Sequence, residues 1–410
     1  MFSILSTIGP EIPFSLALLA MLGLRVGVHP RVSLWINAAP EKVFPLVDLH
    51  DGKIEDWGRT VTTTERIDKT SGIFRKTYNT TLSTGVTRSF SALFSIAQRT
   101  APEYISLKRE GLEGKSHANE LLEQNYRLTP ERGGTRLDID YVWGARPLIA
   151  QLIARTDLWG GIYRLKGLAE TGSPNERPFQ IISGGVAIVT GLITMAGFTL
   201  LLHWEVAALL IFALFIHEFG HLLAYRLMGQ PWGRMIFLPF LGAIAMPRLP
   251  FESQGQAVFA ALMGPGFSTL LAIACALPPA LGFTLHPVVG LLGVVTVLLN
   301  IFNLLPVEPL DGGVALRSVL SRIMGRWARF GLMLVGALLI IVGFAMNQIL
   351  LMIFGGIAIL ANIKERSIDA GLTPLTSLQI TISFFSYVTM ITAYITLLRY
   401  FGDLAALLPK

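Results

Sequence analysis

Residues 206–225 read VAALLIFALFIHEFGHLLAY, an apolar stretch that contains His217-Glu218-Phe219-Gly220-His221 near its end. An α-helix needs about 20 apolar residues to cross the hydrocarbon core of a bilayer, and this stretch meets that length. Ionisable side chains at membrane depth cost about 2.5–3.5 kcal/mol on insertion scales, so they are rare and usually functional. The stretch therefore predicts a membrane helix whose ionisable side chains have a functional role.

The pentapeptide has the spacing of a metal site. Positions four apart on a helix share a face, so His217 and His221 can bind one metal ion. Glu218 is then placed to act on a metal-bound water. The pattern is short and also arises in helices that bind no metal, and the alternative is a helix end whose polar residues lie in the headgroup layer. The position within an apolar segment favours the metal site.

Charge is distributed unevenly along the chain. Only 15% of the 410 residues are charged, against about 25% in an ordinary soluble domain. Residues 30–177 contain 39 charged residues in 148, and residues 178–410 contain 19 in 233. A protein confined to one soluble compartment and a disordered chain are both excluded. We expect an N-terminal membrane anchor over residues 1–29, a soluble domain over 30–177, a core membrane domain over 178–327 and additional membrane helices over 328–410.

The apolar segments predict a polytopic all-α transmembrane bundle. The segments are residues 180–202, 206–225, 257–283, 287–305, 330–363 and 378–398, and 330–363 is long enough for two short helices broken near Asn347 and Gln348. Residues 2–24 lack a basic start and an Ala-x-Ala site, which favours an uncleaved anchor over a signal peptide. Lys and Arg gather in alternate loops, which places residues 30–177 on the cytoplasmic side of the plasma (inner) membrane.

The soluble part has an α+β pattern. Val32, Leu34 and Ile36 alternate with polar residues, and Ala39-Pro40 opens a helix. Alternation continues over residues 73–78, 86–96, 104–109, 121–128 and 136–143, and a helical stretch from Pro147 to about Leu168 is interrupted at Gly160-Gly161. This order resembles the START-like, polyketide-cyclase-like superfamily (SRPBCC). The resemblance implies a helix-grip-like fold and an apolar cavity for a lipid or apolar ligand, with a structural or partner-docking role equally open.

A zinc site needs a third protein ligand while it leaves one position for water. Asp311 lies in the string NLLPVEPLDGG, residues 303–313, at the end of a later apolar segment. The prolines would unwind the helix end, and the glycine pair allows a tight turn that could bring the carboxylate inward. Without the histidines, Asp311 would be an interfacial loop acid.

These motifs together resemble the site-2 protease family of intramembrane zinc metalloproteases. The similarity covers about residues 180–315 and includes Gly264-Pro265, which resembles the helix-packing motif of the family. It implies that His217, His221 and Asp311 bind Zn²⁺, that Glu218 is the general base, and that Asn303 helps to hold substrate or the transition-state oxygen. Ser268 stands where many members carry asparagine, which puts a packing or substrate contact in question.

The implied activity is hydrolysis of peptide bonds in transmembrane or membrane-proximal segments of protein substrates, in contact with membrane lipids. Residues 235–246 are too short to span the bilayer, and in the family this region re-enters as strands. An exposed edge there could take up unwound substrate by strand addition, and an interfacial hairpin without such a role is the alternative. Glu308 is expected at the interface.

The sequence also bears on three other functions. The first is a lipid- or apolar-ligand-binding membrane protein whose protease-like part is catalytically silent, but the complete set of ligands and Glu218 argues against it. A transporter would leave the HExxH motif unexplained, and no inverted repeat is visible. The net charge of +6 comes without a basic run, so no nucleic-acid partner is expected. The single cysteine, Cys275, excludes an internal disulfide.

Overall fold

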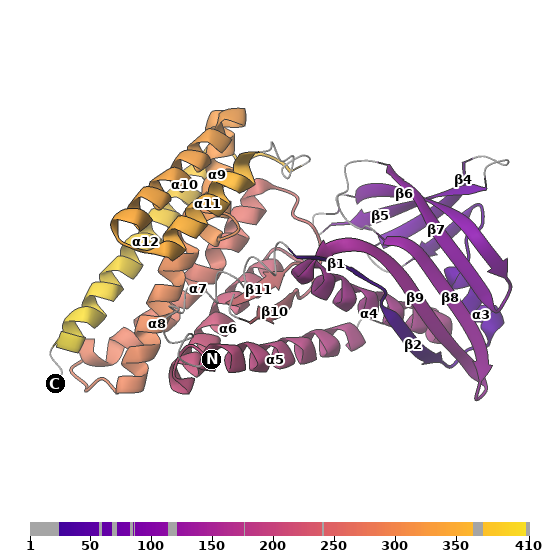
Figure 1. Cartoon of the computed structure of the whole chain (residues 1–410), viewed down its shortest axis with the longest axis horizontal. Coiled ribbons are helices and arrows are strands. Elements are labelled where there is room, and N and C mark those ends of the chain that lie inside the picture. Colours follow the sequence, from indigo (N-terminus) through magenta and orange to yellow (C-terminus); the bar gives the residue numbers. More distant parts are fainter. Residues whose placement is uncertain are drawn as a thin grey trace, which may run out of the picture. The chain divides into compact units, whose positions relative to one another are not determined.

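The computed structural model describes residues 24–56, 60–67, 72–82, 85, 87–113, 121–175, 177–239, 242–363 and 372–406. The chain divides into two compact units between Gly185 and Val186, here called the sheet unit and the helical unit (Figure 1). Residues 1–23 of the predicted N-terminal anchor lie outside the described residues, and Arg25–Val28, near its predicted end, form a strand of the sheet unit instead. Each unit is described by itself.

The sheet unit is one antiparallel sheet with two helices. Its strands are β1 (Arg25–Val28), β2 (Arg31–Ile36), β3 (Lys53–Asp56), β4 (Thr60–Arg66), β5 (Ile73–Thr81), β6 (Thr87–Thr100), β7 (Tyr104–Glu113), β8 (Leu121–Glu131) and β9 (Gly134–Pro147). The order is β1-β9-β8-β7-β6-β5-β4-β3, and β2 also pairs with β9. Helix α3 (Pro40–Val47) follows β2, and the long helix α4 (Leu148–Thr171) follows β9. The expected α+β order is therefore present.

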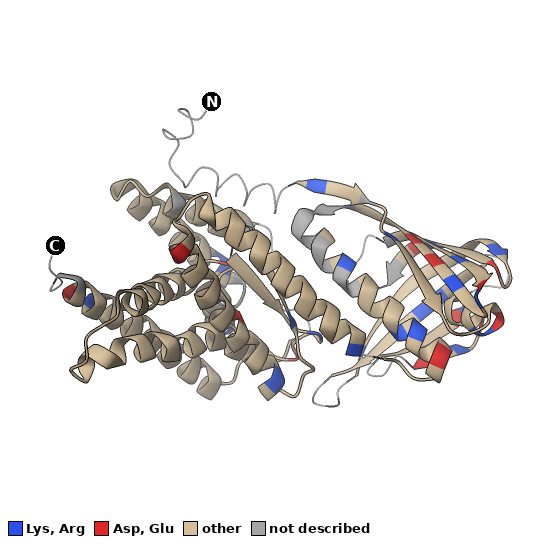
Figure 2. Ribbon diagram, turned by 90° about the horizontal axis from the view of Figure 1, so that it is seen from below, with Lys and Arg blue, Asp and Glu red and all other residues tan. Residues whose placement is uncertain are grey.

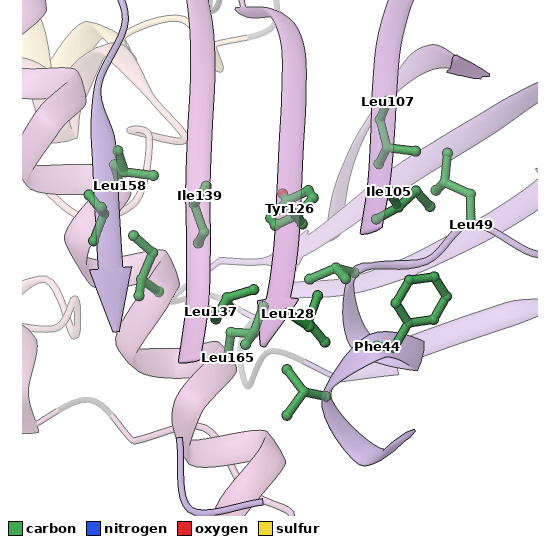
Figure 3. Close-up of a cluster of buried hydrophobic side chains, with 14 of the residues drawn as sticks. Phe44, Leu49, Ile105, Leu107, Tyr126, Leu128, Leu137, Ile139, Leu158 and Leu165 are labelled. Atoms are coloured by element: carbon green, nitrogen blue, oxygen red, sulfur yellow. The ribbon is translucent and has the colours of Figure 1, made fainter. Parts of the chain in front are cut away.

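Figure 3 shows the core of the sheet unit, where side chains from α3, α4 and the central strands form one cluster. Phe44, Ile105, Leu128, Leu137 and Leu165 are all buried there. The inward residues of each strand alternate with outward ones, as the apolar alternation predicted. This packing against the last helix positions the cavity described below.

Several features of the sheet unit differ from the prediction, which also lacked strands β1 and β3. Helix α4 runs through Gly160-Gly161 without interruption, because Gly160 serves close packing: a Cβ there would lie 2.5 Å from Cδ2 of Phe179. Strand β4 was not predicted, because its inward face consists of the buried threonines Thr62 and Thr64 rather than of apolar residues.

The helical unit contains most of the apolar helices. They are α5 (Arg177–Thr199, which begins in the sheet unit), α6 (Trp204–Leu227), α7 (Gln254–Ala280), α8 (Pro287–Asn303), α9 (Asp311–Met324), α10 (Ala328–Ala345), α11 (Ile349–Ile363) and α12 (Ser377–Ala406), with a short 3₁₀ turn at Gly325–Trp327. Among the described residues, five helices (α5, α6, α7, α10 and α12) are long and apolar enough to cross a membrane. Charged residues are sparse here and frequent on the strands, as Figure 2 shows. The prediction of a multi-pass membrane protein is confirmed.

The connections of the helical unit explain two details. The predicted break between α10 and α11 occurs at Asn347, whose φ of +53° ends a helix. The unit also contains a two-stranded sheet that covers the segment 235–246, which the family resemblance expected to re-enter as strands. This hairpin pairs β10 (Arg234–Leu238) with β11 (Gly242–Met246), and four of the five β10 residues are buried.

Candidate metal centre

Helix α6 presents three ionisable side chains on one buried region. His217, Glu218 and His221 have only 2%, 4% and 7% of their surface exposed. One turn separates the two histidines, and their Nε2 atoms lie 3.2 Å apart. The helical spacing in the sequence therefore becomes a pair of imidazoles that face a common point.

Asp311 comes to the same point from a segment about ninety residues later. Its Oδ2 atom lies 3.1 Å from His217 Nε2 and 3.5 Å from His221 Nε2. The chain turns sharply after α8, and α9 begins at Asp311 itself. Gly312 and Gly313 are required for this turn, because a Cβ on either would overlap the backbone of residues 304–308. The structure thus brings together the three predicted ligands.

Each imidazole is oriented by an oxygen atom at its other nitrogen. His217 Nδ1 lies 2.8 Å from Asn300 Oδ1, and His221 Nδ1 lies 2.7 Å from the Ala260 carbonyl oxygen. Both partners are carbonyl oxygens, which only accept hydrogen bonds. The hydrogen-bond network therefore assigns a proton to each Nδ1 atom, so the neutral form of each ring has its lone pair on the Nε2 atom that faces Asp311.

The donor set fits a zinc ion. Two Nε2 lone pairs and a carboxylate oxygen converge, and Asp311 Oδ2 has no hydrogen-bond donor among the described residues. Tetrahedral zinc with bonds of about 2.0–2.1 Å sets its ligand atoms about 3.3–3.4 Å apart, and the three observed separations are 3.1, 3.2 and 3.5 Å. With both imidazoles neutral, three acceptors this close repel one another, and a cation between them removes this repulsion.

Glu218 adjoins this point but is held differently. The backbone N–H of Ala245 on β11 donates a hydrogen bond to its carboxylate, and its Oε2 atom is buried without a partner among the described residues. The Tyr225 hydroxyl donates to the Ala245 carbonyl oxygen at 3.2 Å. Both backbone groups of Ala245 therefore contact α6, so this part of the β11 edge is occupied.

Glycines let α6 and α7 approach closely behind the imidazoles. A Cβ on Gly264 would overlap the His221 ring and lie 3.0 Å from His217 Nε2. A Cβ on Gly220 would likewise lie 2.8 Å from the Phe267 Cβ. Ser268 is fully buried, and its Oγ has no partner among the described residues. The Gly264-Pro265 motif is thus a packing element next to the candidate ligands.

Two asparagines of α8 have different surroundings. Asn303, which the sequence singled out, donates from Nδ2 to the Leu299 carbonyl oxygen at 3.1 Å, and no contact with the three ligands is described for it. Asn300, which sequence reasoning missed, is fully buried and bonded to His217. The signal that could have identified Asn300 is a polar amide within the apolar stretch VVGLLGVVTVLLNIFN. A polar side chain at membrane depth is energetically costly, which is the reason that α6 was singled out. Glu308, expected at the interface, is largely buried and pairs with Arg317 at 2.7 Å.

Comparison with known proteins finds a family match that covers part of the helical unit. Residues 279–346 match the family described as "Peptidase family M50", a range that contains Asn303 and Asp311 and begins after the histidines. The chain is 32% identical over 154 residues to a Synechocystis sp. protein whose name assigns it provisionally to the zinc metalloproteases. This similarity covers 36% of each chain. It is 26% identical over 147 residues to a zinc metalloprotease of Methanocaldococcus jannaschii, which covers 34% of this chain and 42% of the relative.

The chain thus matches less than half of the length of these two relatives. Among solved structures, the site-2 protease of Methanocaldococcus jannaschii is 20% identical, and the similarity covers 45% of this chain and 92% of that one with a TM-score of 0.32. The family match and the two relatives agree with the paired motifs found in the sequence. Over residues 279–346 the helical unit is thus similar to peptidase family M50, the site-2 protease family, and the two relatives match 34–36% of this chain.

Proposed function

We propose that this chain is an intramembrane zinc endopeptidase that hydrolyses peptide bonds in transmembrane or membrane-proximal segments of other proteins. The observation that carries the proposal is the convergence of His217 Nε2, His221 Nε2 and Asp311 Oδ2 at separations of 3.1, 3.2 and 3.5 Å, which match tetrahedral zinc. The names of the two relatives, both zinc metalloproteases, support zinc as the metal. The basic loops support a cytoplasmic position for residues 30–177.

The roles of the residues follow from their chemistry. His217, His221 and Asp311 would hold the ion, which when bound acidifies a water molecule and polarises a peptide carbonyl. Glu218 would accept a proton from that water at its unpartnered Oε2 and later donate it to the leaving amine. The Ala245 N–H fixes the Glu218 carboxylate, so the free oxygen keeps one direction.

Substrate handling would involve the hairpin and the end of α8. A helical peptide must unwind before its carbonyl can be attacked, and an unwound segment can pair with a strand edge. The N–H of Ala245 is bonded to Glu218 and its carbonyl oxygen to Tyr225. A substrate strand would therefore pair with other residues of the β11 edge, or with Ala245 only after these two hydrogen bonds break. Asn303 stands at the last turn of α8 and remains our candidate for a substrate contact.

The test uses the full chain reconstituted in liposomes with a membrane-protein substrate identified by trapping. The Glu218→Gln variant should retain about one zinc per chain, bind the trapped substrate and leave it uncleaved, whereas the wild type cleaves it and a chelator stops the reaction. Equal cleavage by both forms would refute the role of Glu218. If the wild type holds no zinc, or if its zinc does not depend on His217 and Asp311, the metalloprotease proposal is refuted and the catalytically silent alternative is favoured.

The sheet unit suggests a second, separate function in ligand binding. A cavity of about 150 Å³ lies between the sheet, α3 and α4, and its walls include Phe94, Leu107 and Ile139. A cavity of this volume holds a molecule about the size of benzene. We therefore favour a small apolar ligand, or one end of a larger one, over an enclosed lipid.

Polar groups line one part of this cavity. The Tyr126 hydroxyl lies 2.8 Å from that of Tyr141, and Lys76 pairs with the buried Glu55 at 2.9 Å. Burial raises the pKa of Tyr141 to about 12, so its hydroxyl stays protonated at neutral pH. The ligand would therefore carry a small number of polar atoms that complement these groups.

Phenol is a suitable probe for the cavity, because it combines one ring with one hydroxyl. Gly161 also lines the cavity, and a Cβ there meets nothing within 4 Å. Gly161→Leu should therefore fill the space and abolish phenol binding measured by calorimetry on the full chain. Equal binding by the variant would refute the cavity as a site. Unchanged proteolysis by the same variant would separate ligand binding from control of the protease.

A further inference from the structure

The two imidazoles of the candidate metal centre are oriented by partners of different kinds. His221 bonds to the main-chain carbonyl of Ala260, which any residue at that position would supply. His217 bonds to the side chain of Asn300, which is encoded by that residue alone. The orientation of one ligand therefore depends on a single side chain that the motifs do not include.

The geometry of Asn300 determines which of its atoms faces the histidine. Its amide group has one donating end and one accepting end, and the neighbouring hydrogen-bond partners decide which end faces which way. The Thr296 carbonyl oxygen, 2.7 Å from Nδ2, can only accept. The NH₂ end must therefore point to Thr296, which leaves Oδ1 at 2.8 Å from His217 Nδ1.

An acceptor at Nδ1 requires the proton there. The His217 ring then carries its hydrogen on Nδ1 and its lone pair on Nε2, the atom that faces Asp311 Oδ2 at 3.1 Å. The opposite tautomer would place two acceptors, Oδ1 and Nδ1, against each other and a hydrogen where the metal should bind. Metal-binding histidines in general depend on such a partner to fix the ring and its tautomer.

Helix α8 holds Asn300 rigidly for this purpose. Gly293, Thr296, Val297 and Asn300 form its buried stripe, at the spacing of one helix face. Asn300 and Thr296 are both fully buried, so no solvent competes for the amide. The pair is thus fixed by the same helix that leads into the Asp311 segment.

We propose that Asn300 is a positioning residue that selects the metal-binding tautomer of His217. This inference rests on the proposed zinc site. It extends that site by one residue that lies three positions before the recognised Asn303, and it assigns the two asparagines different tasks.

The decisive measurement is zinc affinity, by competition with a chelator, on purified full chains. Loss of a histidine's outer partner typically weakens metal binding about 10–100-fold, and we expect that loss for Asn300→Leu. Asn362 is the matched control: it is a buried asparagine in the apolar helix α11 that donates to the Ala358 carbonyl oxygen one turn earlier, with no histidine described beside it. Asn362→Leu should change zinc affinity less than about threefold.

Two further variants keep the inference testable if Asn300→Leu does not fold. Asn300→Asp retains an oxygen acceptor but loses the donor to Thr296, so it should bind zinc at least as tightly as the wild type. Once His217 is replaced by Ala, Asn300→Leu should add no further loss, because the two residues act through one contact. The visible absorption of the cobalt(II) form should change with Asn300→Leu and not with Asn362→Leu.

The outcomes separate the inference from the proposed function. Wild-type zinc binding that depends on His217 but is unaffected by Asn300→Leu would overturn the role of Asn300 and leave the metal site intact. A tenfold loss in Asn300→Asp would also overturn it, since the acceptor is retained. Wild-type protein that binds no zinc through His217 would overturn the proposed function itself.

Discussion

Gly264→Ala tests whether the close approach of α6 and α7 holds the metal ligands in place. The new methyl carbon would lie 3.0 Å from His217 Nε2 and closer still to the His221 ring, whereas ordinary contact begins at 3.4 Å. His217 must then move by about 0.4 Å, the difference between these distances, and His221 by more. Coordination tolerates only about 0.2 Å of departure from ideal metal–ligand distances. The variant should therefore lose zinc affinity by at least the 10–100-fold typical of a disturbed site.

The control for this prediction lies two residues along the same helix. A Cβ on Gly266 meets only the terminal Cε of Met390, at 3.1 Å, and a flexible methionine end can move aside. Gly266→Ala should therefore retain zinc and unfold within about 1 kcal/mol of the wild type. Zinc would be measured by chelator competition and by metal analysis of the purified full chain. Stoichiometric, tightly bound zinc in Gly264→Ala would refute the packing argument.

Three further predictions concern stability. In α4, Gly160→Ala should destabilise the sheet unit by about 1–3 kcal/mol, because the new methyl group overlaps the Phe179 ring. Gly161→Ala has open space around the new methyl group and should stabilise the unit by about 0.5–1 kcal/mol. Denaturant unfolding measures both changes, and equal effects would contradict the packing argument. Glu308→Gln removes the charge that pairs with Arg317 at 2.7 Å, and should lower the melting temperature at a cost of about 1.5–3 kcal/mol; an unchanged melting temperature would show that the pair contributes nothing. Burial raises the pKa of Glu55, but the two neighbouring lysines outweigh burial and the net shift is downward. The resulting stability is present above the ordinary glutamate pKa of 4.5 and is lost as pH falls through the lower pKa of the folded state. Melting temperatures followed from pH 5 to 3 should therefore show a smaller acid-induced loss in Glu55→Gln than in the wild type.

Much of the architecture was predictable because strong local patterns produced it. Long apolar stretches can satisfy their backbone in a bilayer only as helices, and the break at Asn347 appeared where two polar residues interrupt such a stretch. Alternating apolar residues predicted the central strands of the sheet unit. Strand β4 was not predicted, because threonines rather than apolar residues fill its inward face. The helix break predicted at Gly160 was wrong, because this glycine makes room for Phe179, nineteen positions later.

The candidate site divides in the same way. The sequence by itself determined which residues could form the site. The i,i+4 spacing puts His217 and His221 on one helix face, and an ionisable side chain at membrane depth is costly and therefore usually functional. Only the tertiary structure decided that Asp311 approaches both imidazoles, that Asn300 and not Asn303 orients one of them, and that β11 contacts Glu218. These contacts join helices and strands far apart in the chain, and no local pattern encodes the separation or rotation at which packed helices present their side chains to one another.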